Sequence, residues 1–170
     1  SGGSESFDVD PKKIAHAITY INNASKPLLL IGSQVLLNID LIPKLIEALG
    51  TIGIPIYLSG MARGLMGVNH PLQFRHSRGA ALKEADLVLL AGVPLDFRLN
   101  YGKAIRSKTL IVSINRDEHD LKQNRKPDLG IQTDPAKFLV SLAEKNAKFE
   151  QKPELKDTRK QWLLEMTARE

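Results

Sequence analysis

The sequence predicts an α/β domain with a mostly parallel sheet of five or six strands between two helical layers. Short apolar runs recur roughly every 20–30 residues, as buried parallel strands do. Amphipathic stretches with helical spacing separate these runs, and glycines follow three of them. Strands that alternate with helices form βαβ units with right-handed crossovers, which together make a three-layer Rossmann-like fold.

The predicted strands are short and apolar. They cover residues 27–31, 54–58, 87–91, 110–114 and, more weakly, 129–132. The carboxyl ends of parallel strands share one edge of the sheet, and ligands of such sheets bind at that edge. The residues that follow each strand are therefore the first candidates for a binding site.

Capping residues mark the expected helix starts. Asp10 precedes Pro11 and Asp134 precedes Pro135, and each pair joins a side-chain cap to a residue suited to the first turn. Ser77 is the cap expected for a helix over residues 77–85.

Glycine, proline and charge mark the expected helix ends and linkers. Gly50 is predicted to stop the second helix. The charged segment 146–154 contains a proline and indicates a linker. In the last helix, Trp162 shares a face with Met166 and is expected to be a packing anchor.

Composition excludes several classes of protein. The chain has 170 residues, 42% hydrophobic and 25% charged, which suits one globular domain, and its apolar runs are too short to span a bilayer. It has no cysteine, so disulfides and cysteine-based metal sites are excluded, and its four histidines have no ligand spacing. The net charge of +5 is dispersed and aromatic residues are only 5%, which disfavours a nucleic-acid partner. Localisation stays open, although the lack of cysteine suits a reducing intracellular context.

Three glycines follow predicted strands: Gly32, Gly60 and Gly92. A glycine at a strand end lets the backbone approach a phosphate closely, but it is equally a common turn residue. The full GxGxxG fingerprint is absent, because Gly32-Ser33-Gln34 keeps only its first position. Asn115 and Arg116 stand where many dinucleotide-binding folds carry a ribose-binding acid, so an ordinary NAD dehydrogenase is disfavoured.

Charged side chains are expected near the same edge. The arginines are Arg63, Arg75, Arg78 and Arg98. Arginine suits bidentate phosphate binding, and Arg78, at a helix start, is the strongest candidate, with surface solvation as the alternative. Asp96 and Asp117 have no catalytic partner in the sequence, so a structural or solvated role is favoured for both.

Several stretches, in this order and spacing, resemble the central domain of thiamine diphosphate enzymes. They are Lys26–Gly32, Leu49–Ile56, Gly60–Gly67, Asn69–Leu72, Ala80–Gly92 and Asp96–Gly102. The resemblance is closest to the eukaryotic acetolactate synthase-like proteins and the 2-hydroxyacyl-CoA lyases. It implies a Rossmann-like central domain of the DHS-like NAD/FAD-binding type. In this interpretation residues 1–9 are a cloning scar or linker, 10–145 the central domain, and 146–170 a linker and helix toward the next domain.

The resemblance also implies what lies outside this chain. Thiamine diphosphate and Mg²⁺ would be bound by other domains of a homo-oligomeric enzyme that acts on a small-molecule substrate. The diphosphate motif Gly-Asp-Gly is absent here, so the isolated domain is expected to be inactive. In relatives this domain holds FAD, ADP or nothing. The positions that would contact an ADP- or FAD-type nucleotide are Gly32, Ser33, Gln34, Gly60, Met61, Arg78, Gly92, Asn115 and Arg116.

Two other functions remain open. A purely structural assembly domain without nucleotide is favoured by Asn115 and Arg116, which replace the acidic pattern common in relatives. A stand-alone enzyme related to the deacetylase-like Rossmann variants is disfavoured, because zinc cysteines are absent.

Overall fold

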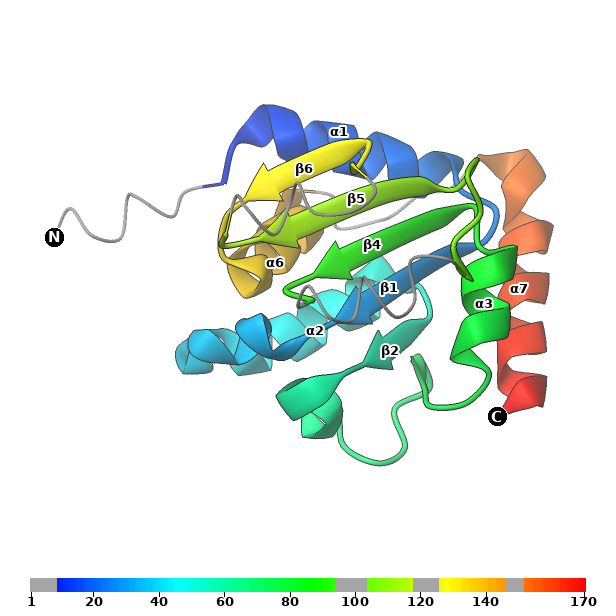
Figure 1. Ribbon diagram of the computed structural model, residues 1–170, viewed down its shortest axis with the longest axis horizontal. Coiled ribbons are helices and arrows are strands. Elements are labelled where there is room, and N and C mark those ends of the chain that lie inside the picture. The colour runs from blue at the N-terminus through cyan, green and yellow to red at the C-terminus, as the bar shows by residue number, and fades with distance from the viewer. Residues whose placement is uncertain (1–8, 94–103, 118–125, 146–151) are drawn as a thin grey trace, which may run out of the picture.

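A six-stranded, wholly parallel sheet organises the chain, as Figure 1 shows. The computed structural model describes residues 9–93, 104–117, 126–145 and 152–170. The strands are β1 (Pro27–Ile31), β2 (Ile56–Leu58), β3 (Gln73–Phe74), β4 (Leu87–Ala91), β5 (Leu110–Asn115) and β6 (Leu129–Gln132). Their order across the sheet is β3-β2-β1-β4-β5-β6. The predicted α/β class and parallel sheet are confirmed.

Helices cover both faces of the sheet. One face packs against α1 (Pro11–Asn23), α2 (Ile42–Ile52) and α6 (Pro135–Lys145), and the other against α3 (Arg78–Glu84) and α7 (Lys156–Arg169). Strand residues alternate between the two cores, so that Leu29 and Ile31 join the first while Leu28 and Leu30 join the second. Both faces are buried, which explains why the two central strands, β1 and β4, are apolar at every position rather than at every second one.

The described residues also form short 3₁₀ helices. They are η2 (Ser33–Leu37), η3 (Ile39–Leu41), η4 (Gly60–Gly64) and η6 (Pro153–Leu155), the last of which leads into α7. The first three continue from the carboxyl ends of β1 and β2, so they form part of the edge at which the sequence predicted a ligand.

Two of the three predicted N-caps act as caps. The Asp10 carboxylate accepts the N–H of Lys12 at 2.9 Å, and the Asp134 carboxylate accepts that of Lys137 at 3.2 Å. Ser77 also stands at an N-cap position, but its φ is 58° and its side chain makes no capping hydrogen bond. The prediction of a serine cap was therefore right in place and wrong in mechanism.

Two elements have other boundaries than the sequence predicted, and one strand was not predicted. Gly50 lies inside α2, which continues to Ile52 and ends at Gly53, whose φ of 69° is the left-handed conformation that favours glycine. β2 begins at residue 56 rather than 54 because Pro55 has no N–H to donate. β3, at 73–74, was missed because two residues are too few to show a periodicity.

The helix α7 is anchored on the sheet by a buried tryptophan. Trp162 is 1% exposed, and its indole N–H donates to the carbonyl of Pro27 at 2.9 Å. Arg159 donates to the carbonyl of Ile21 at 2.9 Å, and burial lowers the pKa of its guanidinium although Asp86 partly opposes this. The expected role of Trp162 as a packing anchor is confirmed.

Candidate functional site

The predicted site residues gather at the carboxyl edge of the sheet. Eight of the nine follow or end strands β1, β2, β4 and β5, and the ninth, Arg78, begins α3. After β1 the chain continues to β2 and β3 on one side of the sheet, and after β4 it continues to β5 and β6 on the other side. The switch point, where ligands of doubly wound sheets bind, therefore lies between Gly32 and Gly92.

The chains that leave β1 and β4 pass very close to each other. A Cβ atom placed on Gly32 would lie 2.3 Å from the carbonyl oxygen of Gly92 and 2.8 Å from the Cα of Val93. Gly92 has a φ of 68°, and a Cβ there would lie 2.7 Å from the Cβ of Gln34. Contact within the chain is therefore enough to explain both glycines.

Gln34 reaches across the edge to the end of β5. Its side-chain nitrogen donates to the Asn115 side-chain oxygen at 2.9 Å, and its oxygen accepts the N–H of Arg116 at 3.1 Å. Asn115, which is 2% exposed, also accepts the N–H of Asp117 at 2.9 Å. The two amide side chains thus satisfy each other and the local backbone, and neither presents a carboxylate to a ribose.

An acid does lie beside these residues, but it follows β6. Asp134 is 2% exposed and receives the guanidinium of Arg116 at 2.8 Å. Its second oxygen accepts from the Asn38 amide at 3.3 Å and from the Lys137 N–H at 3.2 Å. In the sequence Asp134 was visible only as a helix cap, because its pairing with Arg116 depends on the β5–β6 contact.

Ser33, Gly60 and Met61 join the ends of β1 and β2. The Ser33 hydroxyl accepts the N–H of Met61 at 3.0 Å. Gly60 has a φ of 58°, and a Cβ there would lie 2.6 Å from the Ser33 oxygen. The Met61 side chain is 80% exposed, so it lies on the surface at this edge.

Arg78 lies apart from the other predicted residues, at the end of β3. Its guanidinium carbon is 5.6 Å from the centroid of the Tyr57 ring, within the range of a cation–π contact. Burial, with a smaller contribution from Glu170, raises the pKa of Tyr57 to about 12, so this phenol stays neutral. Arg78 also lines a cavity of about 300 Å³ together with Arg63 and Arg75.

Two further candidates from the sequence, Arg98 and Asp96, lie outside the described residues. The described ranges hold no group of three or more histidine or acidic residues able to bind a metal, and within them no helix is long and apolar enough to cross a membrane. Gln73 and Glu170, which support Arg75, carried no signal in the sequence.

The strand order and the two helical layers define a doubly wound α/β domain of the Rossmann type. Residues 14–142 match the family model "Thiamine pyrophosphate enzyme, central domain". The chain belongs to this family, which confirms the resemblance inferred from its motifs.

The relatives point to one group within that family. The chain is 46% identical over 138 residues to 2-hydroxyacyl-CoA lyase 2 of Bos taurus and 40% identical over 138 residues to that of Homo sapiens, covering 79% of this chain and 22% of each relative. It is 32% identical over 123 residues to the acetolactate synthase large subunit IlvG of Mycobacterium tuberculosis, covering 72% of this chain and 22% of that protein. The chain therefore spans about a fifth of the length of these relatives.

A solved structure shares the fold. It comes from Mycobacterium smegmatis and is described as a thiamin diphosphate-dependent enzyme. The TM-score is 0.66 at 22% identity, and the match covers 81% of this chain and 28% of the other. At this identity the likeness supports the fold alone.

Proposed function

We propose that this chain is the central, non-catalytic domain of a larger thiamine diphosphate-dependent carbon–carbon lyase or synthase. The observation that carries the proposal is the family match over residues 14–142, together with relatives in which the matched part is 22% of the length. We propose that this domain extends from residue 10 to residue 145, a range that includes the matched residues.

The chemistry would reside in the other domains. Thiamine diphosphate, when bound with Mg²⁺, supplies a carbanion-stabilising centre for carbon–carbon cleavage or formation. The names of the relatives favour a 2-hydroxyacyl-CoA or a 2-keto acid as the substrate of the whole enzyme. The role proposed for this chain is to support those domains within a homo-oligomer.

The catalytic part of the proposal is tested by comparing the isolated domain with the whole enzyme. Purified domain is mixed with thiamine diphosphate, Mg²⁺ and either 2-hydroxyacyl-CoA or pyruvate, and no turnover is expected. The full-length protein, assayed in parallel, is expected to turn over one of the two substrates. Turnover by the isolated domain, or none by the full-length protein, contradicts the proposal.

For the nucleotide, weak binding of ADP or of a CoA-type tail is proposed in preference to tight binding of FAD. Arg78 supports an anionic ligand, because a charge-assisted contact is typically worth about 1.5–3 kcal/mol. Tight FAD is disfavoured because Asn115 offers the ribose no carboxylate and is engaged with Gln34.

Calorimetry with ADP and with FAD, on wild type and on Arg78→Ala, tests the nucleotide. Weak ADP binding that falls about tenfold or more in the variant is expected. Submicromolar FAD binding, or ADP binding unchanged by the substitution, contradicts it.

A purely structural domain is the second candidate function. The observation that favours it is the set of contacts among Gln34, Asn115, Arg116 and Asp134, which joins these side chains to one another and to the local backbone. If neither ADP nor FAD binds, this function becomes the better one.

A further inference from the structure

A cavity lined by three arginines lies at the carboxyl ends of β2 and β3. It is separate from the contact between Gly32 and Gly92, which lies between β1 and β4. Its volume is about 300 Å³, at the lower end of the range for small-molecule sites. The described residues that line it, here called the arginine pocket, are Leu58, Arg63, Gln73, Phe74, Arg75 and Arg78. Three of these lining residues are arginines and none is acidic.

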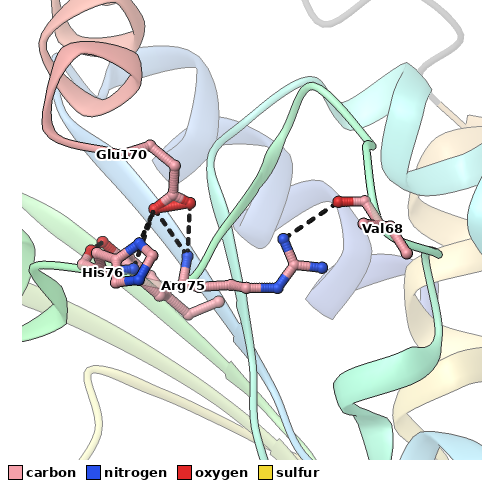
Figure 2. Close-up of polar contacts among 5 residues, drawn as sticks. Val68, Arg75, His76 and Glu170 are labelled. Atoms are coloured by element: carbon pink, nitrogen blue, oxygen red, sulfur yellow. Dashed lines mark hydrogen bonds and ion pairs between the residues drawn. The ribbon is translucent and has the colours of Figure 1, made fainter.

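Arg75 is held in place by neutral groups. Its guanidinium donates to the carbonyl of Val68 at 3.1 Å, as Figure 2 shows, and to that of Gly67 at 3.3 Å. The Gln73 amide, 6% exposed, fits best with its oxygen 2.6 Å from Arg75 Nη2 and its nitrogen 3.0 Å from the Gly67 carbonyl. These acceptors orient the guanidinium without neutralising its charge.

The backbone that carries Arg75 is fixed by the end of α7. The Glu170 carboxylate accepts the N–H of Arg75 at 2.9 Å and that of His76 at 3.0 Å, and lies 3.2 Å from the His76 ring nitrogen Nδ1 (Figure 2). Glu170 is not among the lining residues. Its hydrogen bonds are directed at the backbone and at His76 rather than into the pocket.

The other two arginines come from separate elements. Arg78 begins α3 and lies over the Tyr57 ring, whose hydroxyl donates to the carbonyl of His76 at 2.5 Å. Arg63 belongs to η4, is exposed, and makes no hydrogen bond or ion pair with the part of the chain that the structure describes. Two segments, the turn η4 and the stretch from the end of β3 to the start of α3, thus bring three guanidinium groups to one cavity.

We propose that the arginine pocket binds a phosphate group of a small-molecule ligand. A guanidinium presents a planar fork of N–H donors that matches phosphate oxygens, and a phosphate has enough oxygens to engage several such forks at once. The cavity's small volume suits the phosphate end of a ligand, with the remainder outside. This proposal places the phosphate group of the proposed nucleotide in the arginine pocket. It rests on the proposed nucleotide function only for the identity of the ligand.

Inorganic pyrophosphate is the probe, because its binding needs no nucleoside. Binding to the full chain is measured by calorimetry at constant ionic strength, with thermal melting as the check on folding. Arg63→Ala and Arg75→Ala are each expected to weaken binding about tenfold, the loss of one charge-assisted contact. Lys83→Ala removes the same charge from an exposed position on α3 outside the pocket, and it is expected to leave binding within about twofold.

The outcomes separate this inference from the proposed nucleotide function. Pyrophosphate binding that is weakened about tenfold in both arginine variants, with no ADP binding to wild type, supports the pocket and refutes the nucleotide. ADP binding that is unchanged in Arg63→Ala and Arg75→Ala overturns the pocket while the nucleotide proposal survives. Absence of pyrophosphate binding, or an equal loss in Lys83→Ala, overturns the pocket outright. If Arg75→Ala fails to fold, Arg63→Ala decides the matter, because its exposed side chain has no described partner to lose.

Discussion

A methyl group at Gly32 would collide with backbone atoms. In Gly32→Ala the new Cβ would lie 2.3 Å from the Gly92 oxygen, 2.8 Å from the Val93 Cα and 2.9 Å from the Gly92 carbon. No rotamer change relieves these contacts, because all three atoms are backbone, so the ends of β1 and β4 must separate. Overpacking typically costs about 1–3 kcal/mol, and backbone contacts this short place the expected loss at about 3 kcal/mol or more.

Gly50→Ala is the matched control. Gly50 lies inside α2, and a Cβ there has no heavy atom within 4 Å. Alanine should therefore stabilise the helix, by about 0.5–1 kcal/mol, because it loses less backbone entropy on folding. The same substitution is thus expected to have opposite signs at the two glycines.

Urea unfolding followed by far-UV circular dichroism measures both free energies. Since domains are stable by only about 5–15 kcal/mol, a loss of about 3 kcal/mol shifts the midpoint clearly. A Gly32→Ala protein as stable as wild type would refute the close approach of the two strand ends. A destabilised Gly50→Ala protein would refute the position of Gly50 within α2.

Three further predictions concern the contacts that hold the edge and the last helix. Trp162→Phe should cost about 1–3 kcal/mol in urea unfolding, because the carbonyl of Pro27 loses its buried donor; no loss would mean that this bond is not formed. Asp134→Ala should cost about 2–4 kcal/mol, since it removes both the cap of α6 and the partner of Arg116, whereas a loss below about 1 kcal/mol would contradict the buried pair. Burial raises the pKa of Glu170, but its hydrogen bonds outweigh this and leave the pKa below its usual 4.5. The stability that Glu170 adds over Glu170→Gln should therefore be present above pH 4.5 and be lost as the pH falls through the lowered pKa; a difference that does not change with pH contradicts this.

The periodicity of the sequence determined most of the layered fold. Five of the six strands and the helices between them were predictable, because apolar runs, caps such as Asp10 and helical stripes are patterns within a few residues. The same local order, taken together along the chain, carried the resemblance to the thiamine diphosphate enzymes. Where a local signal was ambiguous, as at Gly50, the boundary was wrong by a few residues, because a single glycine within a helix costs only about 1 kcal/mol and does not have to end it.

The tertiary structure alone decided what the edge residues do. Gly32 and Gly92 are separated by about sixty residues of sequence, and only the β1–β4 pairing brings their backbones into contact. The same holds for the hydrogen bond between Gln34 and Asn115, which are separated by about eighty residues of sequence. Side-chain partners across a parallel sheet depend on strand order and on the crossovers between strands. Since these are properties of the whole chain, no local pattern in the sequence could specify them.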